Sequence, residues 1–189
     1  MTVPRLPHRT LPVGTALYRI HRATRAPWFF DGSGAGRFDP VGAPGRGTSY
    51  WALSPLGAWV EVFRSRTLLT EEDISDRRLT VATLTGPLVV ADLAVARALK
   101  SGVTAATTSA GDYSASQELA RAVQGAERAI RWRLRHDLRG KSFGLALFGS
   151  CGDAAPTGIE TSEAEALPDS LIERAVSVFG YEILPSPPR

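Results

Sequence analysis

The segment IRWRLRHD, residues 130–137, concentrates side chains that could do chemistry. Read with a period of two, it predicts a strand with one apolar face and one basic face, the latter formed by Arg131, Arg133 and Arg135. A planar guanidinium matches two oxygens of a phosphate group. The basic face therefore suits a nucleic-acid backbone, an anion-binding wall in an enzyme or a solvated sheet edge, and the segment alone leaves these interpretations open.

A glutamate, Glu61, lies at the edge of an expected amphipathic helix. Ser54 and Pro55 suit the N-cap and the first position of a helix over 55–65. The apolar side chains of that helix recur at helical spacing: Leu56, Trp59, Val60 and Phe63. Glu61 is beside this stripe, so we expect its carboxylate at the boundary between core and solvent, where a cleft could form.

General catalytic motifs are absent from the sequence. There is no G-x-x-x-x-G-K-[ST], H-E-x-x-H or G-x-S-x-G, and GSGAGR (32–37) lacks the strand-to-helix context of a nucleotide-binding loop. The single cysteine, Cys151, excludes an internal disulfide and a cysteine-only metal site. His8, His21 and His136 show no metal-ligand spacing, although His21 and His136 are candidates for acid–base catalysis.

The composition is typical of a soluble globular protein, and the cytoplasm is the expected location. The 189 residues suffice for one domain with a sizeable core, and 43% of them are hydrophobic and 22% charged. A formal net charge of +3 is a weak basic excess, which argues against direct nucleic-acid binding. The chain has neither a signal-like N-terminus nor about 18 consecutive apolar residues, so we expect no membrane segment.

The order of expected elements predicts an α+β fold with a mostly antiparallel sheet and flanking helices. Strands are expected over 16–23, 48–53, 79–93 (broken at Gly86-Pro87), 129–135, 142–149 and 181–184. Helices are expected over 55–65, 114–126 and 169–179, with short ones starting at Thr70 and, capped by Asp92, running to Leu99. Residues 1–14 are expected to form an N-terminal arm, 15–189 a single domain, and 25–47 and 151–166 loops.

Several short motifs occur in an order that resembles the RES domain family, which is named for an arginine, a glutamate and a serine. They are Tyr18-Arg19, Gly36-Arg37-Phe38-Asp39-Pro40, Tyr50-x-Ala52, Ala58-x-x-Glu61, Tyr113-x-x-Ser116-Gln117 and the basic strand. The resemblance extends from Leu17 to Phe148, most of the chain.

This resemblance implies a split sheet similar to that of the ADP-ribosyltransferase toxins. It also implies a toxin of a toxin–antitoxin pair, with an Xre-type helix-turn-helix antitoxin as partner and, in some assemblies, a homodimer. The implied reaction is cleavage of the nicotinamide–ribose bond of NAD+, by hydrolysis or phosphorolysis. NAD+ is then the substrate, and no cofactor or metal is expected.

The resemblance also assigns roles to particular residues. Glu61 would stabilise the positive charge that develops on the ribose as nicotinamide leaves. Arg19 and Arg37 would hold the pyrophosphate, and Tyr50 would stack on nicotinamide or donate its hydroxyl to the ribose. The expected site residues are therefore Glu61, Arg19, Tyr50, Arg37, Trp132 and Leu134.

Leu134 departs from the family pattern G-I-x-Y-x-S-R. Aligning AIRWRLRHD (129–137) on it places Trp132 at the tyrosine and Leu134 at the signature serine. Three interpretations stay open: the serine is dispensable, Ser116 or Tyr113 replaces its hydroxyl, or the protein is weakened or altered in activity. If Leu134 stands where the family's serine should be, Leu134→Ser should raise NAD+ cleavage or substrate affinity.

The sequence leaves rival functions. One is ADP-ribosyl transfer to a protein, and another is a catalytically weakened RES-like protein that binds a nucleotide or a partner. A third is a nucleic-acid-binding module, which lacks a recognition helix or an aromatic stacking platform here. Whether water, phosphate or a protein accepts the ADP-ribosyl group is also open.

Overall fold

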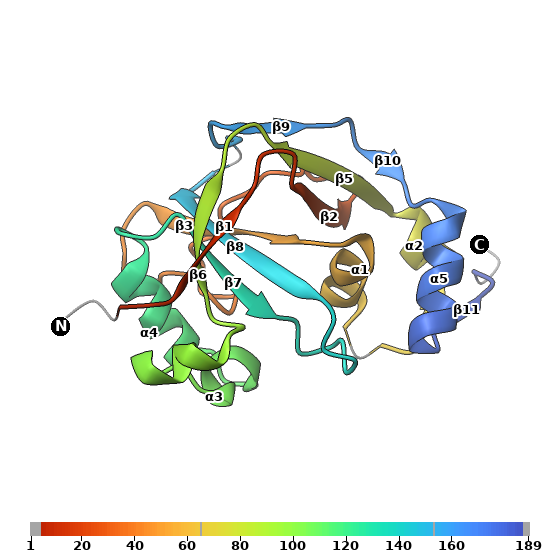
Figure 1. The fold of residues 1–189 in the computed structure, drawn as a ribbon. Helices are drawn as coiled ribbons and strands as arrows, with labels where there is room; N and C mark the ends of the chain where they lie inside the picture. Colours follow the sequence, from red (N-terminus) through yellow and green to blue (C-terminus); the bar gives the residue numbers. More distant parts are fainter. Residues whose placement is uncertain (1–4, 65, 153, 187–189) are drawn as a thin grey trace.

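The computed structural model describes residues 5–64, 66–152 and 154–186, and its centre is a curled nine-stranded sheet (Figure 1). In spatial order its strands are β1 (His8–Leu11), β6 (Leu88–Asp92), β7 (Ala129–Arg133), β8 (Phe143–Ser150), β3 (Arg46–Ala52), β2 (Ala16–Arg22), β5 (Arg77–Leu84) and β10 (Glu165–Ala166), with β9 (Ile159–Thr161) also on β5. Among the described strands of this sheet, only β6 and β7 pair in parallel. The predicted α+β fold with a mostly antiparallel sheet is confirmed.

The helices lie in separate groups around the sheet. At one end of the molecule are α3 (Ala105–Ser109) and α4 (Ser114–Val123), preceded by the 3-10 helix η1 (Ala96–Ser101). At the other end are α2 (Glu71–Ser75) and α5 (Asp169–Phe179), near a two-stranded parallel sheet of β4 (Leu68–Thr70) and β11 (Glu182–Leu184) (Figure 1).

Helix α1 (Pro55–Phe63) follows β3 and packs on β2. Its start is as expected: the Ser54 side chain accepts a hydrogen bond from the Gly57 N–H at 3.1 Å, with Pro55 in the first turn. The predicted apolar stripe of this helix is buried in the larger of two cores. Glu61 therefore lies on a helix whose apolar side is fixed in the core.

The sheet diverges between β2 and β3. These strands share a single ladder pair, Tyr18 with Ala52, whereas β2 pairs along its whole length with β5 and β3 with β8. A side-chain bond bridges the gap, because Arg19 donates to the Ser49 hydroxyl at 2.8 Å. Where the two strands separate, side chains of β2, β3 and α1 surround a cavity.

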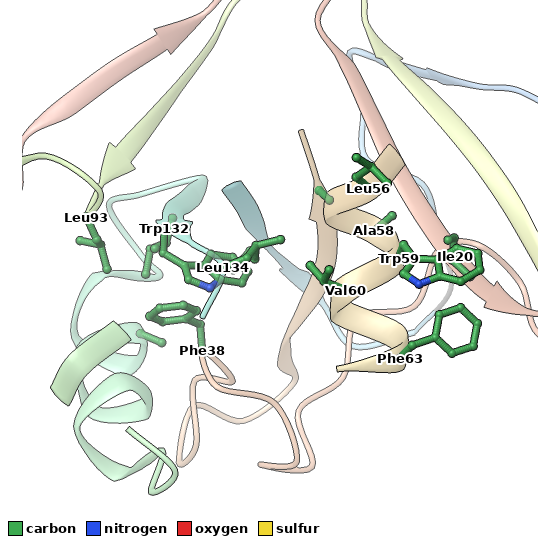
Figure 2. Close-up of a cluster of buried hydrophobic side chains, with 14 of the residues drawn as sticks. Ile20, Phe38, Leu56, Ala58, Trp59, Val60, Phe63, Leu93, Trp132 and Leu134 are labelled. Atoms are coloured by element: carbon green, nitrogen blue, oxygen red, sulfur yellow. The ribbon is translucent and has the colours of Figure 1, made fainter. Parts of the chain in front are cut away.

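Two cores lie on the two faces of the sheet. One is enclosed by the curl of the sheet and contains Leu17, Trp51 and Leu145. The other lies under the helices and contains Trp59, Trp132 and Leu134. Phe38 lies beside Trp132 (Figure 2). Their ring centroids are 4.9 Å apart.

Several expected elements differ in the structure. Residues 8–11 of the expected arm form β1, which pairs with β6. Asp92 ends β6 and caps no helix, because η1 begins only at Ala96; its carboxylate instead binds Arg131 at 2.8 Å and accepts the Ala94 N–H at 3.1 Å. The expected loop 151–166 includes β9 and β10, and the basic strand ends at Arg133. Among the described helices, none is long and apolar enough to cross a membrane.

Candidate active site

A cavity of about 220 Å³ occupies the divergence between β2 and β3. Its walls come from β2, β3, α1, the loop around Gly36 and the turn that follows β7. Among the described residues that line it, Glu61 is the one carboxylate, and four are arginines: Arg19, Arg37, Arg64 and Arg135. The positive lining suits an anionic substrate.

Glu61 projects from α1 into this cavity and is partly buried. Burial raises the pKa of its carboxyl group, while the nearby charges of Arg64, Arg37 and Arg135 act in the opposite direction. No hydrogen bond from a described residue holds this carboxylate. Glu61 is therefore a desolvated carboxyl group that is free to act on a ligand, as expected from its position beside the apolar stripe.

Arg19 lies on β2 and faces the cavity. Burial lowers the pKa of its guanidinium to about 10, so it stays charged at neutral pH. Its Nη1 donates to the buried hydroxyl of Ser49, and no ion pair with a described carboxylate occupies it. This single bond orients the guanidinium, and the remaining N–H groups of Arg19 are available to an anion.

Arg37 reaches the cavity from the loop between β2 and β3 and is 8% exposed. Its Nη2 donates to the Ala110 carbonyl at 2.9 Å, and its guanidinium lies 4.5 Å from the centre of the Tyr113 ring. Its Nη1 is buried without a hydrogen-bond partner among the described residues. A buried donor without a partner is costly, so Arg37 is poised for an acceptor that the protein does not supply.

Tyr50 lines the cavity, but the protein already uses its hydroxyl. The hydroxyl donates to the Asp39 carboxylate at 2.8 Å and accepts from the Phe38 N–H at 2.7 Å, while Asp39 accepts the Gly36 N–H. Burial, reinforced by Asp39, raises the Tyr50 pKa well above its usual range. Tyr50 thus anchors the loop that carries Arg37. The sequence had led us to expect a hydroxyl that is available to the ribose, and it did not indicate this anchoring role.

Removing this hydroxyl should loosen the loop. In Tyr50→Phe the Asp39 carboxylate loses a donor and the Phe38 N–H loses its acceptor, so we expect the free energy of unfolding to fall by about 1–3 kcal/mol. Urea unfolding measures the loss. The control is Tyr18→Phe, because the Tyr18 hydroxyl bonds to no other described residue; equal losses in the two variants would contradict the anchoring role.

The two remaining expected residues, Trp132 and Leu134, have different environments in the structure. Trp132 lines the cavity, whereas Leu134 does not and is 1% exposed. Leu134 packs on two glycines, since a Cβ at Gly144 would lie 2.7 Å and one at Gly57 3.4 Å from its side chain. The Leu134 side chain is buried in the core (Figure 2), so Leu134 is the one expected site residue that does not line this cavity.

The three arginines of the basic strand also have different environments. Arg131 is 7% exposed and forms an ion pair with Asp92 at 2.8 Å, whereas the Arg133 guanidinium bonds the Gly140 carbonyl. Arg135 lies beyond the end of β7 and faces the cavity. The strand is therefore neither a continuous basic face nor a solvated edge, and only its last arginine belongs to the candidate site.

Sequence reasoning missed the roles of Arg135 and Arg64 at this cavity. Arg135 donates to the Ala110 carbonyl at 3.0 Å, the same oxygen that Arg37 binds, and both guanidinium groups flank the Tyr113 ring. The final arginine of the family pattern aligns with Arg135 and was the available signal. Nothing in the local sequence marks Arg64.

Of the other polar candidates, some line the cavity and others lie away from it. His136 lines the cavity, and its Nε2 accepts from the Arg135 Nε at 3.0 Å. Burial and the charges of Arg135, Arg64 and Arg37 lower its pKa, so the imidazole is neutral near neutral pH. His21 bonds Thr80 and the Arg22 carbonyl away from the cavity. Ser116 is fully buried and donates to the Thr107 carbonyl, so of the proposed hydroxyl substitutes only Tyr113 reaches the cavity.

Comparisons with known proteins agree with this architecture. A chain in the crystal structure of the M. tuberculosis MbcT–MbcA toxin–antitoxin complex superposes with a TM-score of 0.65 at 18% identity, over 90% of this chain and 92% of that chain. No curated protein matches the sequence. The model of the RES domain matches residues 16–168, which include every residue of the candidate site. The chain therefore belongs to the RES domain family.

Proposed function

We propose that this protein is a RES-type toxin that cleaves the nicotinamide–ribose bond of NAD+. The observation that carries the proposal is the Glu61 carboxylate, desolvated and without a hydrogen-bond partner among the described residues, in a cavity lined by four arginines. Such a site supplies one negative charge for a reacting cation and several positive charges for phosphates. The family membership and the toxin–antitoxin complex that contains the similar fold support the same proposal.

The chemistry needs little beyond these groups. As nicotinamide leaves, positive charge develops on the ribose, and a carboxylate fixed in a low-dielectric site stabilises it. Nicotinamide departs neutral from a cationic substrate, so no general acid is required. This agrees with His136, whose lowered pKa leaves it without a proton to give at neutral pH.

The size of the cavity indicates how much of the substrate it encloses. At about 220 Å³ it is below the range of about 300–1,000 Å³ that is common for ligand sites. We therefore expect it to hold the reacting nicotinamide–ribose half, with the phosphates among the arginines. The acceptor is water or phosphate in this proposal, and ADP-ribosyl transfer to a protein would use the same Glu61.

The buried position of Leu134 favours an active enzyme over a weakened binder. The groups proposed to act, Glu61 and the arginines, line the cavity without any contribution from the Leu134 side chain. A missing hydroxyl at this position therefore removes none of them. An Xre-type antitoxin is the proposed partner, and the cytoplasm, which holds the NAD+ pool that such a toxin consumes, is the proposed location.

The pH dependence of turnover should reflect Glu61. Because burial raises the Glu61 pKa and the ionised form is needed, kcat/KM should fall as the pH drops through that pKa, at a higher pH than for an ordinary glutamate. Arg37 lowers the Glu61 pKa, so Arg37→Ala should move this acid limb to still higher pH. A pH–rate profile of both proteins measures the limb, and a shift to lower pH would contradict the assignment.

Expression in a bacterial host tests the proposed function. Induction of the wild-type protein should lower the cellular NAD+ pool and stop growth, whereas Glu61→Gln should do neither. Co-expression of a cognate antitoxin should restore both. An unchanged NAD+ pool and normal growth on induction of folded wild-type protein would refute the proposal.

A further inference from the structure

Arg64 stands at the mouth of the cavity, directly after the last residue of α1. Its side chain is exposed and lines the cavity, and its Nε donates to the Glu61 carbonyl at 3.3 Å. Neither Nη atom binds an acceptor in the described part of the chain. The helix end thus uses one of the guanidinium nitrogens, and the two Nη groups remain available to a ligand.

The backbone of Arg64 is strained. With φ 51° and ψ −124°, it is the one non-glycine residue at positive φ among those described. Such conformations cost a residue with a Cβ about 1–3 kcal/mol, whereas glycine adopts them readily. Nine glycines occupy the other positive-φ positions of the described chain, so this fold elsewhere uses the residue that suits the conformation. The arginine side chain therefore has a role that the turn itself does not require.

The C-terminal segment holds this strained residue. Tyr181 is 6% exposed, and its hydroxyl donates to the Arg64 carbonyl at 3.2 Å. Its ring packs edge-on against Trp59 and Phe63 of α1, at centroid distances of 5.7 and 6.4 Å. Tyr181 lies beyond residue 168, where the match to the family model ends, so this support comes from outside the matched domain.

We propose that Arg64 binds a phosphate of the substrate at the mouth of the cavity, and that Tyr181 is a positioning residue that fixes Arg64 for this contact. The two Nη groups of a guanidinium form a planar pair of donors that fits two phosphate oxygens. Of the neighbouring charges, that of Arg64 lowers the Glu61 pKa most, so Arg64 is close enough to Glu61 to contact the same ligand. The inference rests on the proposed function, since it takes NAD+ as the ligand.

A purely structural role is the rival explanation. A cation at a helix C-terminus is favourable by itself, and the Nε bond to the Glu61 carbonyl satisfies a helix end. In that case the loss of Arg64 would alter stability but not affinity for phosphate. Affinity for phosphate therefore separates the two explanations. Glycine and alanine are both tested at this position, because both remove the guanidinium and only glycine relieves the backbone strain.

The experiment compares Arg64→Gly, Arg64→Ala and Arg64→Lys. Arg64→Gly and Arg64→Ala should each raise KM for NAD+ and Kd for ADP-ribose about tenfold, which is about 1.4 kcal/mol, and Arg64→Lys should recover part of the loss. Arg64→Gly should melt about 2–4 °C above Arg64→Ala. Unchanged KM and Kd in Arg64→Gly would overturn the proposal, and equal melting temperatures of the two variants would contradict the backbone strain at Arg64.

The failure of the proposed function is distinguishable from the failure of this inference. If the wild-type protein does not cleave NAD+, the proposed function is wrong, and Arg64 is then tested by calorimetry with inorganic pyrophosphate. Pyrophosphate binding that weakens in Arg64→Gly still supports the anion site. Binding of equal strength in the two proteins overturns it.

A double-mutant cycle tests Tyr181. Tyr181→Phe keeps the ring and removes the hydroxyl, so KM for NAD+ should rise about threefold to tenfold in the wild-type background. In the Arg64→Gly background the same change should have no further effect on KM, because the residue on which it acts is gone. Equal effects in both backgrounds would show that Tyr181 does not act through Arg64.

Discussion

Glu61→Gln should lower kcat for NAD+ cleavage about a hundredfold to a thousandfold. The substitution keeps the size and polarity of the side chain and removes the charge that would stabilise the developing cation. No other carboxylate among the described cavity residues could take over this role. KM should change little, because the arginines still bind the phosphates. Steady-state release of nicotinamide measures the effect.

The same substitution should not unfold the protein. The folded-state pKa of Glu61 is raised by burial, so the ionised carboxylate disfavours folding above that pKa, and Gln should make the protein equally or more stable at neutral pH. The matched control is Glu118→Gln on the exposed face of α4, which should keep full activity. Full activity in Glu61→Gln, or an equal loss in both variants, would exclude Glu61 as the catalytic carboxylate.

Leu134→Ser should lower the free energy of unfolding by about 3–5 kcal/mol. It replaces a side chain that is 1% exposed with a smaller polar one, which leaves a void above Gly144 and buries a hydroxyl. Because the position does not line the cavity, we expect no gain in NAD+ cleavage. This reverses the expectation from sequence, in which the serine would have restored activity.

Leu134→Met is the control for this substitution. It nearly conserves the volume and should cost less than about 1.5 kcal/mol. Denaturant unfolding of the two variants, with NAD+ turnover measured well below their midpoints, separates stability from activity. Faster turnover by a stably folded Leu134→Ser protein would show that the hydroxyl reaches the substrate.

Local patterns in the sequence predicted the elements that carry the site. The Ser54-Pro55 start and the apolar stripe correctly placed α1, and therefore put Glu61 at the boundary of the core. The expected strands gave β2 and β3, with Arg19 and Tyr50 on them. These features depend on neighbours in the chain, so periodicity and capping suffice to find them.

Features that depend on distant contacts were not predictable in the same way. The Tyr50 hydroxyl is engaged by Asp39 and Phe38 only because the loop folds back on β3. Alternation correctly places Leu134 on the buried face with Ile130 and Trp132, but it does not reveal that Trp132 lines the cavity and Leu134 does not. Arg64 reaches the cavity through an unusual turn that the distant Tyr181 stabilises.

The most direct test of the proposed function is the fate of NAD+ with purified wild-type protein. The enzyme, free of any antitoxin, is incubated with NAD+ in buffer with and without phosphate, and the products are separated chromatographically. We predict saturable release of nicotinamide, with ADP-ribose formed if water is the acceptor and a phosphorylated ADP-ribose if phosphate is. NAD+ that stays intact in both buffers, with a folded protein, would contradict the central claim.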